Sequence, residues 1–187
     1  NEQVDVGQVG NFGTGNFSVS LWVKANQLAG SGPDIGILTK RAVCSASDAS
    51  WGITTFGNGT VGFGMTTQGG ANVGVTSVYS NRSIVAGQWY HIVATRQANT
   101  IALYIDGVLD NSTTSTQPLF NPDNNAPLRI GAYVCKSLGL AQHLNGSVDE
   151  LALFNRALTA SEVTALYPAE FIPTNPRATY LRTNGDN

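Results

Sequence analysis

Paired carboxylates are the residues whose spacing could give this chain a hydrolytic chemistry. A retaining glycosidase needs two acidic side chains about 5 Å apart on one face, and a strand supplies them when acids alternate along it. The only adjacent acids, Asp149 and Glu150, lie in one predicted strand. Neighbours in a strand point to opposite faces, so this pair does not predict a glycosidase site.

The two histidines do not indicate catalysis either. His91 lies inside the apolar run from Trp89 to Thr95, so we interpret it as structural. The sequence contains no G-x-S-x-G nucleophile motif and no phosphate-binding P-loop. We therefore predict no catalytic residues and expect a protein that is not an enzyme.

Two cysteines, Cys44 and Cys135, lie far apart in polar loops that each follow a predicted strand. Their separation matches no zinc-binding spacing. A disulfide formed in an oxidising compartment fits this context better than two buried free thiols, which remain the alternative. We therefore predict a Cys44–Cys135 disulfide and an extracellular or cell-surface location.

The composition excludes two classes of partner. Charged residues make up 12% of the 187 residues, and the formal net charge is −2. The ten basic residues are scattered, so no basic stripe could follow a phosphate backbone, and nucleic acid is not expected. No apolar run reaches the ~18 residues that a membrane span needs, so membrane insertion is not expected.

Short strands separated by turns recur along the whole chain. The run from Phe17 to Lys24 alternates, with Val19, Leu21 and Val23 on one face, and Gly57-Asn58-Gly59 is a strong hairpin turn. Further strands are expected at 3–6, 35–39, 51–56, 60–65, 73–78, 88–95, 100–105, 128–132 and 148–154. This spacing predicts an all-β fold, a two-sheet antiparallel sandwich of jelly-roll type.

One short helix is predicted over residues 160–166. Thr159 is a typical N-cap, and Glu162 three residues later completes a capping box. Leu158 and Val163 occupy the two positions of a hydrophobic staple. Pro168 disfavours helical geometry at Tyr167, so the helix should end there.

The ordered segments FSVSLWVK, ILTK, QWYHIVATR, IALYIDGVL, LRIGA and GSVDELALFNRALTASEVTALY resemble concanavalin A-like, laminin G-like jelly-roll domains. The last segment is also similar to the end of the pentraxins. The resemblance covers residues 3–167, so we assign residues 1–167 to one laminin G-like domain. It implies two curved sheets of six or seven strands, with binding at loops on the concave side or rim.

The pentraxin-like part of the resemblance implies positions for a calcium site. Asp48 falls near the first acidic ligand position and Gln142 near a later amide position. The central acidic run of that site would fall on residues 132–134, Ala-Tyr-Val, whose side chains cannot coordinate calcium. A double calcium site is therefore not expected. One structural Ca²⁺ remains an option, held by Asp34, Asp48 or Asp123 with backbone carbonyls.

The same resemblance places the loops of Cys44 and Cys135 side by side at one rim of the concave face. That rim would also present Trp51, Tyr133, Gln142 and His143, and Asp48 lies in one of its loops. Aromatic faces and neutral amides suit neutral sugars, so we take these five residues as candidate ligand contacts. The alternative is that Trp51 and Tyr133 belong to the sandwich core.

The C-terminal tail suggests that the chain is rotated relative to the family. Residues 168–177 contain three prolines and form a predicted connector. Residues 178–187, ATYLRTNGDN, resemble the strand and turn with which the family usually opens. The chain could be a circular permutant or one period of a tandem array, and a solvated tail is the alternative. We expect Ala178–Arg182 to form a strand that pairs beside Gln3–Val6, supplied by this chain or by a neighbouring copy.

We conclude from the sequence that the chain is a non-catalytic extracellular recognition module that binds a polysaccharide or other glycan. The alternative is a structural repeat unit of an extracellular fibre, sheath or adhesin. Such a unit would bind copies of itself through the C-terminal strand.

Overall fold

The computed structural model describes residues 3–30, 34–43, 48–66, 75–116, 118, 121–134, 142–167 and 182–183 of the 187-residue chain. These residues form two six-stranded sheets and one two-stranded sheet. Sheet A has the order β1-β10-β3-β4-β5-β6, with bounds Val4–Asp5, Leu128–Ile130, Ile35–Lys40, Ser50–Thr55, Thr60–Thr66 and Val75–Ser83. Sheet B has the order β14-β13-β2-β7-β8-β9, with bounds Arg182–Thr183, Gly146–Phe154, Phe17–Ala25, Trp89–Gln97, Thr100–Ile105 and Val108–Thr114.

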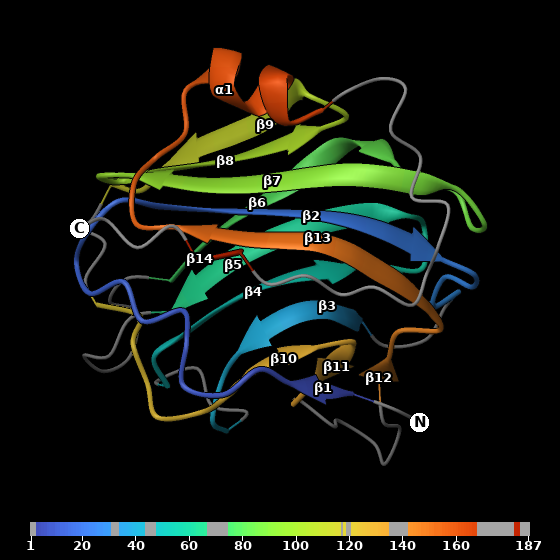
Figure 1. The fold of residues 1–187 in the computed structure, drawn as a ribbon, viewed down its shortest axis with the longest axis horizontal. Coiled ribbons are helices and arrows are strands. Elements are labelled where there is room, and N and C mark those ends of the chain that lie inside the picture. Colours follow the sequence, from blue (N-terminus) through green and yellow to red (C-terminus); the bar gives the residue numbers. More distant parts are fainter. Residues whose placement is uncertain are drawn as a thin grey trace.

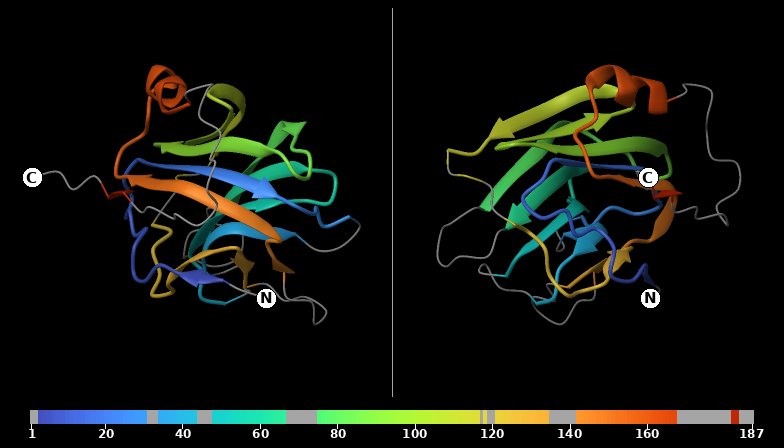
Figure 2. Two further views of the ribbon diagram at one scale, coloured as in Figure 1. Left: turned by 45° about the vertical axis from the view of Figure 1, so that its right-hand side comes forward. Right: turned by 60° about the vertical axis from the view of Figure 1, so that its left-hand side comes forward.

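The two sheets stack face to face and enclose the hydrophobic core (Figures 1 and 2). Strand β2 shows why the sequence folds this way. Its inward residues Phe17, Val19, Leu21 and Val23 are fully buried against sheet A, as their period-two spacing predicts. Except for β13 with β14, all the strand pairs described are antiparallel. The predicted two-sheet jelly-roll sandwich is confirmed.

Three details differ from the predicted strands. β9 (Val108–Thr114) was not expected, because its polar edge-strand sequence has no apolar alternation. The expected strand 128–132 is broken at Gly131, whose φ is 78° and therefore in a region that favours glycine. Beyond this break, β11 (Ala132–Tyr133) leaves sheet A and pairs with β12 (Gln142–His143).

Helix α1 (Ala160–Leu166) has the predicted bounds and the predicted capping box. The Thr159 hydroxyl accepts a hydrogen bond from Glu162 N at 3.3 Å, and the Glu162 carboxylate accepts one from Thr159 N at 2.8 Å. Leu158 and Val163 form a buried cluster with Val93 of β7, which anchors the helix to sheet B. In Figure 1 the helix lies over the β8–β9 end of that sheet.

Of the expected tail strand the structure describes only Arg182, and within this chain Arg182 does not pair beside Gln3–Val6. Arg182–Thr183 form β14 and pair in parallel with Ala152 and Leu153 of β13, whereas Val4 of β1 pairs with Ile130. Arg182 therefore lies at the edge of sheet B, next to β13. It does not lie beside β1, which is the edge strand of sheet A. Residues 168–181, with the proline-bearing connector, lie outside the described residues.

Candidate functional site

A groove of about 220 Å³ lies on the outer face of sheet A. In β4 and β5 the inward residues Ile53 and Phe63 are fully buried in the core, so Gly52, Gly62 and Gly64 face outward. Sheet strands supply most of the remaining lining. The groove is lined by Asp34, Thr39, Arg41, Ser50, Trp51, Gly52, Thr54, Phe56, Gly62, Phe63, Gly64, Met65, Thr66, Val75, Ser77, Tyr79 and Tyr133.

Strand register creates the floor of the groove. Thr39, Gly52, Gly64 and Ser77 form one row across β3, β4, β5 and β6, each opposite the next. The two central positions carry no side chain, so the backbone itself is the floor. A Cβ atom added at Gly64 would lie 3.0 Å from the Ser77 Oγ atom. Small residues in this row therefore make the hollow.

Aromatic side chains form one wall. The Phe56 and Tyr79 rings contact each other edge to face, with centroids 5.6 Å apart. Tyr79 is 51% exposed, so part of its ring remains available to a ligand. Asn111 of β9 donates its amide to the Tyr79 carbonyl oxygen at 2.8 Å, which fixes β6 against the other sheet. This wall can offer a ring face to an apolar surface of a ligand.

The β11–β12 hairpin brings three of the predicted site residues together. Tyr133 pairs with Gln142, and Ala132 pairs with His143. The hairpin is fixed to β3, because the Thr39 hydroxyl donates to the Ala132 carbonyl oxygen at 2.8 Å. Tyr133 also lines the groove. The backbones of residues 132–133 and 142–143 therefore lie side by side, as expected from the sequence.

Two other predicted ligand contacts have structural roles. Trp51 adjoins the groove, yet it is only 2% exposed, and its indole donates to the Gly10 carbonyl oxygen at 2.9 Å. Its ring packs on Phe12 and Phe17, as the core alternative supposed. The Asp48 carboxylate accepts hydrogen bonds from Val43 N at 3.1 Å and from Ala42 N at 3.3 Å. Asp48 therefore shapes the loop after β3.

The three candidate calcium ligands have different contacts in the structure. Asp34 lines the groove and Asp48 lies in the loop after β3. Asp123 accepts hydrogen bonds from Phe12 N and Gly13 N. Within the residues that the structure describes, no group of three His, Cys, Asp or Glu side chains could hold a metal. One structural Ca²⁺ held by Asp34, Asp48 or Asp123 with backbone carbonyls stays a prediction.

Asp123 also compensates buried cations. Lys40 is fully buried, and its amine donates to the Ala126 carbonyl oxygen at 2.6 Å. Burial lowers the pKa of Lys40, and the negative charge of Asp123 partly opposes this effect. Arg96, which is 1% exposed, shows the same lowering of its pKa by burial and the same opposing effect of Asp123. The negative charge of Asp123 thus favours the charged forms of two buried cations, Lys40 and Arg96.

Two charged side chains line the groove. Asp34 precedes β3 and Arg41 follows it, so the six-residue strand separates them by roughly 20 Å. The Arg41 Nε atom donates to the Val43 carbonyl oxygen at 2.9 Å. Burial raises the pKa of Asp34, and a backbone hydrogen bond opposes this rise. The centre of the groove between them is uncharged.

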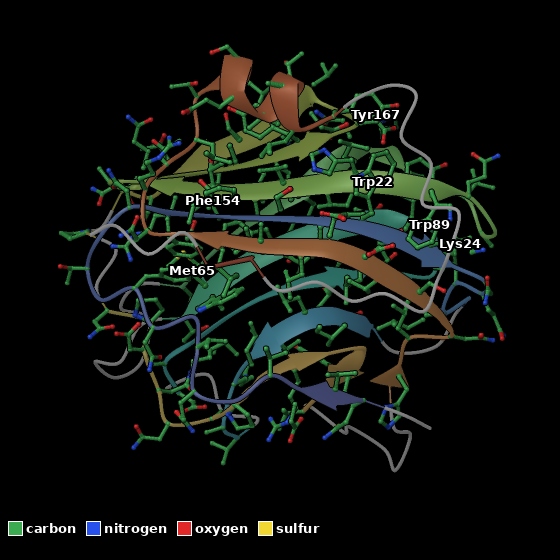
Figure 3. The ribbon with its side chains drawn as sticks, in the orientation of Figure 1. Trp22, Lys24, Met65, Trp89, Phe154 and Tyr167 are labelled. Atoms are coloured by element: carbon green, nitrogen blue, oxygen red, sulfur yellow. The ribbon has the colours of Figure 1, made fainter. Side chains whose placement is uncertain are left out.

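The outer face of sheet B carries an aromatic cluster. The Trp22 ring lies 5.3 Å from His91 and 5.5 Å from Tyr167, measured between centroids. Figure 3 shows Trp22 beside Tyr167, and Trp89 beside Lys24, whose ammonium lies 5.5 Å from the Trp89 ring centroid. His91 is 2% exposed, which gives it the structural role expected from the sequence.

The glycine floor and the Phe56–Tyr79 wall were not predicted from the sequence. A signal was present in β5, where TVGFGMT places Gly62 and Gly64 at alternate positions. Glycine inside a strand often marks a close approach of a ligand or another backbone. What the sequence did not show is that Gly52 lies opposite Gly64.

Two further predictions concern parts of the chain outside the described residues. Cys44 and Cys135 lie beyond the residues described, so their disulfide stays a prediction. The side chain of Gln142 is likewise not described. No helix among the described residues is long and apolar enough to cross a membrane.

The described strands form a jelly-roll sandwich with a groove on the outer face of sheet A. A laminin G family model, described as the concanavalin A-like lectin/glucanases superfamily, matches residues 1–164. The chain belongs to this family. No curated protein matches the chain.

Several solved structures share the fold. The binding domain of Paraclostridial Mosquitocidal Protein 1 matches with a TM-score of 0.67 and 20% identity, over 90% of this chain and 41% of that one. The botulinum neurotoxin serotype G binding domain matches with a TM-score of 0.62 and 19% identity, over 84% and 36%. The CBM40 of a Ruminococcus gnavus sialidase, bound to α2,3 sialyllactose, matches with a TM-score of 0.65 and 10% identity, over 89% and 97%. This chain thus spans less than half of the two toxin binding domains.

Proposed function

We propose that this domain is a non-catalytic, extracellular carbohydrate-recognition module whose ligand binds in the groove of sheet A. The observation that supports it best is the glycine floor beside an exposed aromatic wall. A flat floor without side chains admits a sugar ring, and Tyr79 and Phe56 can stack on the C–H-rich face of that ring. Hydroxyl groups of Ser77 and Thr54 line the same groove and suit polar sugar substituents.

The structural neighbours support the same proposal by analogy. The two toxin structures are of binding domains, and the sialidase CBM40 is bound to α2,3 sialyllactose. Function does not follow from fold, so the proposal depends on the groove. The predicted rim residue Tyr133 lines it, and His143 and Gln142 lie in the adjoining hairpin.

A glycan array with neutral and acidic polysaccharides and sialylated oligosaccharides, with and without Ca²⁺, tests the proposal. We expect selective binding to at least one glycan class. The calcium arm tests the structural ion predicted from the sequence. Uniform failure across all classes and both calcium conditions would refute the proposed function.

Gly64→Val tests the position of the site. The added side chain projects into the groove, and its only close neighbour is the Ser77 hydroxyl, so the sheet should accept it. We expect lost binding with an unchanged fold by circular dichroism. Ser147→Val, on the outer face of β13 in sheet B, is the matched control and should bind normally.

Tyr79→Ala tests the aromatic wall. Tyr79 is half exposed, so its loss should lower the melting temperature little. The affinity should fall roughly tenfold, equivalent to about 1.4 kcal/mol. Val108→Ala removes a side chain that is 67% exposed on β9 and should leave the affinity unchanged. Equal affinities for Tyr79→Ala and wild type would place the ligand elsewhere.

A second function, a structural repeat unit, is favoured by one observation. The C-terminal Arg182–Thr183 segment pairs with the edge of sheet B, and an edge strand can be exchanged between copies by β-augmentation. Light scattering over a concentration series would detect such exchange as assembly, and a monomer at every concentration would contradict it.

A further inference from the structure

A second hollow of about 390 Å³ adjoins the groove at the β4–β5 turn. It is lined by Phe56, Gly57, Asn58, Thr60 and Tyr79. Phe56 and Tyr79 therefore belong to the walls of both hollows. Their rings contact each other edge to face, so this aromatic pair borders both hollows.

The turn that forms the second hollow is held by its own hydrogen bonds. The Asn58 Oδ1 atom accepts from Thr60 N at 3.0 Å, and Gly59 N donates to the Phe56 carbonyl oxygen at 2.9 Å. Gly59 has a φ of 81°, which glycine adopts without strain. Ile84 N donates to the Gly59 carbonyl oxygen at 2.8 Å and ties the turn to the end of β6. The hollow is thus preorganised.

The chemistry of the lining suits a neutral sugar unit. None of the five lining residues is charged. Asn58 is exposed, and its Oδ1 atom is already used within the turn, so the orientation of its amide plane is fixed. The two donors of the amide nitrogen can then serve a sugar hydroxyl without a large ordering cost.

We propose that this hollow is a second sugar subsite, so that the ligand is a chain of at least two sugar units. One unit lies on the glycine floor, and the next passes over the Phe56–Tyr79 pair to Asn58. This inference rests on the proposed function of the groove. It predicts that the domain recognises an oligosaccharide chain and not a single sugar.

The test compares chain lengths in wild type and in Asn58→Asp. Aspartate keeps an oxygen acceptor for Thr60 N, now in a carboxylate, and removes the amide donors. The probes are gluco-, xylo- and galacto-oligosaccharides of one to six units, with lactose and sialyllactose, titrated by calorimetry. Asn121→Asp is the matched control, because Asn121 Oδ1 accepts from Asp123 N at 2.8 Å in a similar turn outside both hollows.

We expect the affinity of the wild-type protein to rise when the oligosaccharide is lengthened from one sugar unit to two or three. Asn58→Asp should weaken the longer probes by roughly threefold to tenfold, the effect of one lost hydrogen bond. It should leave the single-unit affinity unchanged, and Asn121→Asp should match wild type. Asn58→Ser provides a second variant with a neutral side chain that can still close the turn.

The two proposals fail in different ways. Affinity that does not depend on chain length, together with an unchanged Asn58→Asp, would overturn the second subsite and leave the groove intact. If no probe binds to wild type, the proposed function and the second subsite both fall. If probes bind but Gly64→Val has no effect, the ligand lies outside the groove, and a chain that runs from the groove into the second hollow is overturned as well.

Discussion

At the scale of single residues, His91 is the clearest case of an environment that changes a side chain's chemistry. Its Nε2 atom lies 2.8 Å from the Ser20 hydroxyl, and Asp106 Oδ1 accepts a hydrogen bond from its backbone N–H at 3.0 Å. Burial lowers the pKa of His91 to about 4. The folded protein therefore keeps this imidazole neutral well below the pH at which an exposed histidine is protonated.

We predict a pH-dependent stability that comes from His91. Between about pH 6.5 and pH 4 the unfolded chain binds the proton and the folded chain does not. Stability is thus complete above this window and falls as the pH is lowered through it, by on the order of 3 kcal/mol in total. Urea unfolding at several pH values should show this slope in wild type and a smaller slope in His91→Gln.

Glu162 provides the control, because its effect on stability falls in a different pH range. Its carboxylate accepts hydrogen bonds from Arg156 and Thr159, and these lower its pKa to about 2. A lowered acidic pKa contributes stability that is lost only as the pH falls from about 4.5 through 2. Glu162→Gln should therefore keep the slope above pH 4.5. An identical slope in His91→Gln and wild type would rule out His91 as its origin.

At the scale of elements, the stability of the short helix α1 depends on its N-terminal cap. A seven-residue helix is marginal by itself, so the capping box and the contacts of Val163 must hold it. The exposed Arg156–Glu162 ion pair, at 2.8 Å, adds little because solvent screens it. The element therefore forms only where sheet B supplies Val93 to pack against.

Thr159→Ala should lower the free energy of unfolding by about 1 kcal/mol, the typical effect of a lost N-cap. The hydroxyl that accepts from Glu162 N disappears, whereas the buried Leu158 and Val163 remain. Urea denaturation gives the value directly. Thr159→Ser keeps the hydroxyl and should stay close to wild type, so equal losses in both variants would argue against the cap.

At the scale of the whole molecule, the predicted Cys44–Cys135 disulfide would join two loops whose roots already meet. The Thr39 hydroxyl donates to the Ala132 carbonyl oxygen, and each cysteine follows one of these residues by a few positions. We predict that the cysteines are bonded. The bond would close a loop of about 90 residues and stabilise the fold by on the order of 4 kcal/mol.

Alkylation with and without prior reduction, followed by mass measurement, checks this linkage. Wild-type protein should be alkylated at both cysteines only after reduction. The melting temperature should fall on reduction. Two freely alkylated thiols in unreduced protein would contradict the disulfide and remove the main support for an extracellular location.

The tail is the second prediction at this scale. Removing residues 178–187 should destabilise the domain or promote aggregation, because β13 would lose the ladder partner that Arg182–Thr183 provide. Melting temperature and light scattering measure the two effects. Removing only residues 184–187 keeps β14 and should match wild type. A chain without residues 178–187 that behaves like wild type would show that the tail is a solvated linker.

Local patterns in the sequence were sufficient for most elements. Alternation predicted β2, because each strand buries one face, and the capping residues predicted both ends of α1. These features depend on residues that are close together in the chain, so they can be predicted from the sequence alone. The resemblance supplied the sheet arrangement and the proximity of Tyr133 to Gln142.

The tertiary structure alone decided which residues could meet a ligand. Trp51 and Tyr133 are both aromatic residues in strands that adjoin the groove, yet the Trp51 ring is buried in the core and Tyr133 is only partly buried. The edge taken by Arg182 was decided in the same way, since β13 and β1 belong to different sheets. The groove floor exists because register places Gly52 opposite Gly64. Register between strands is set by packing of the whole sandwich, and for that reason no local pattern contains it.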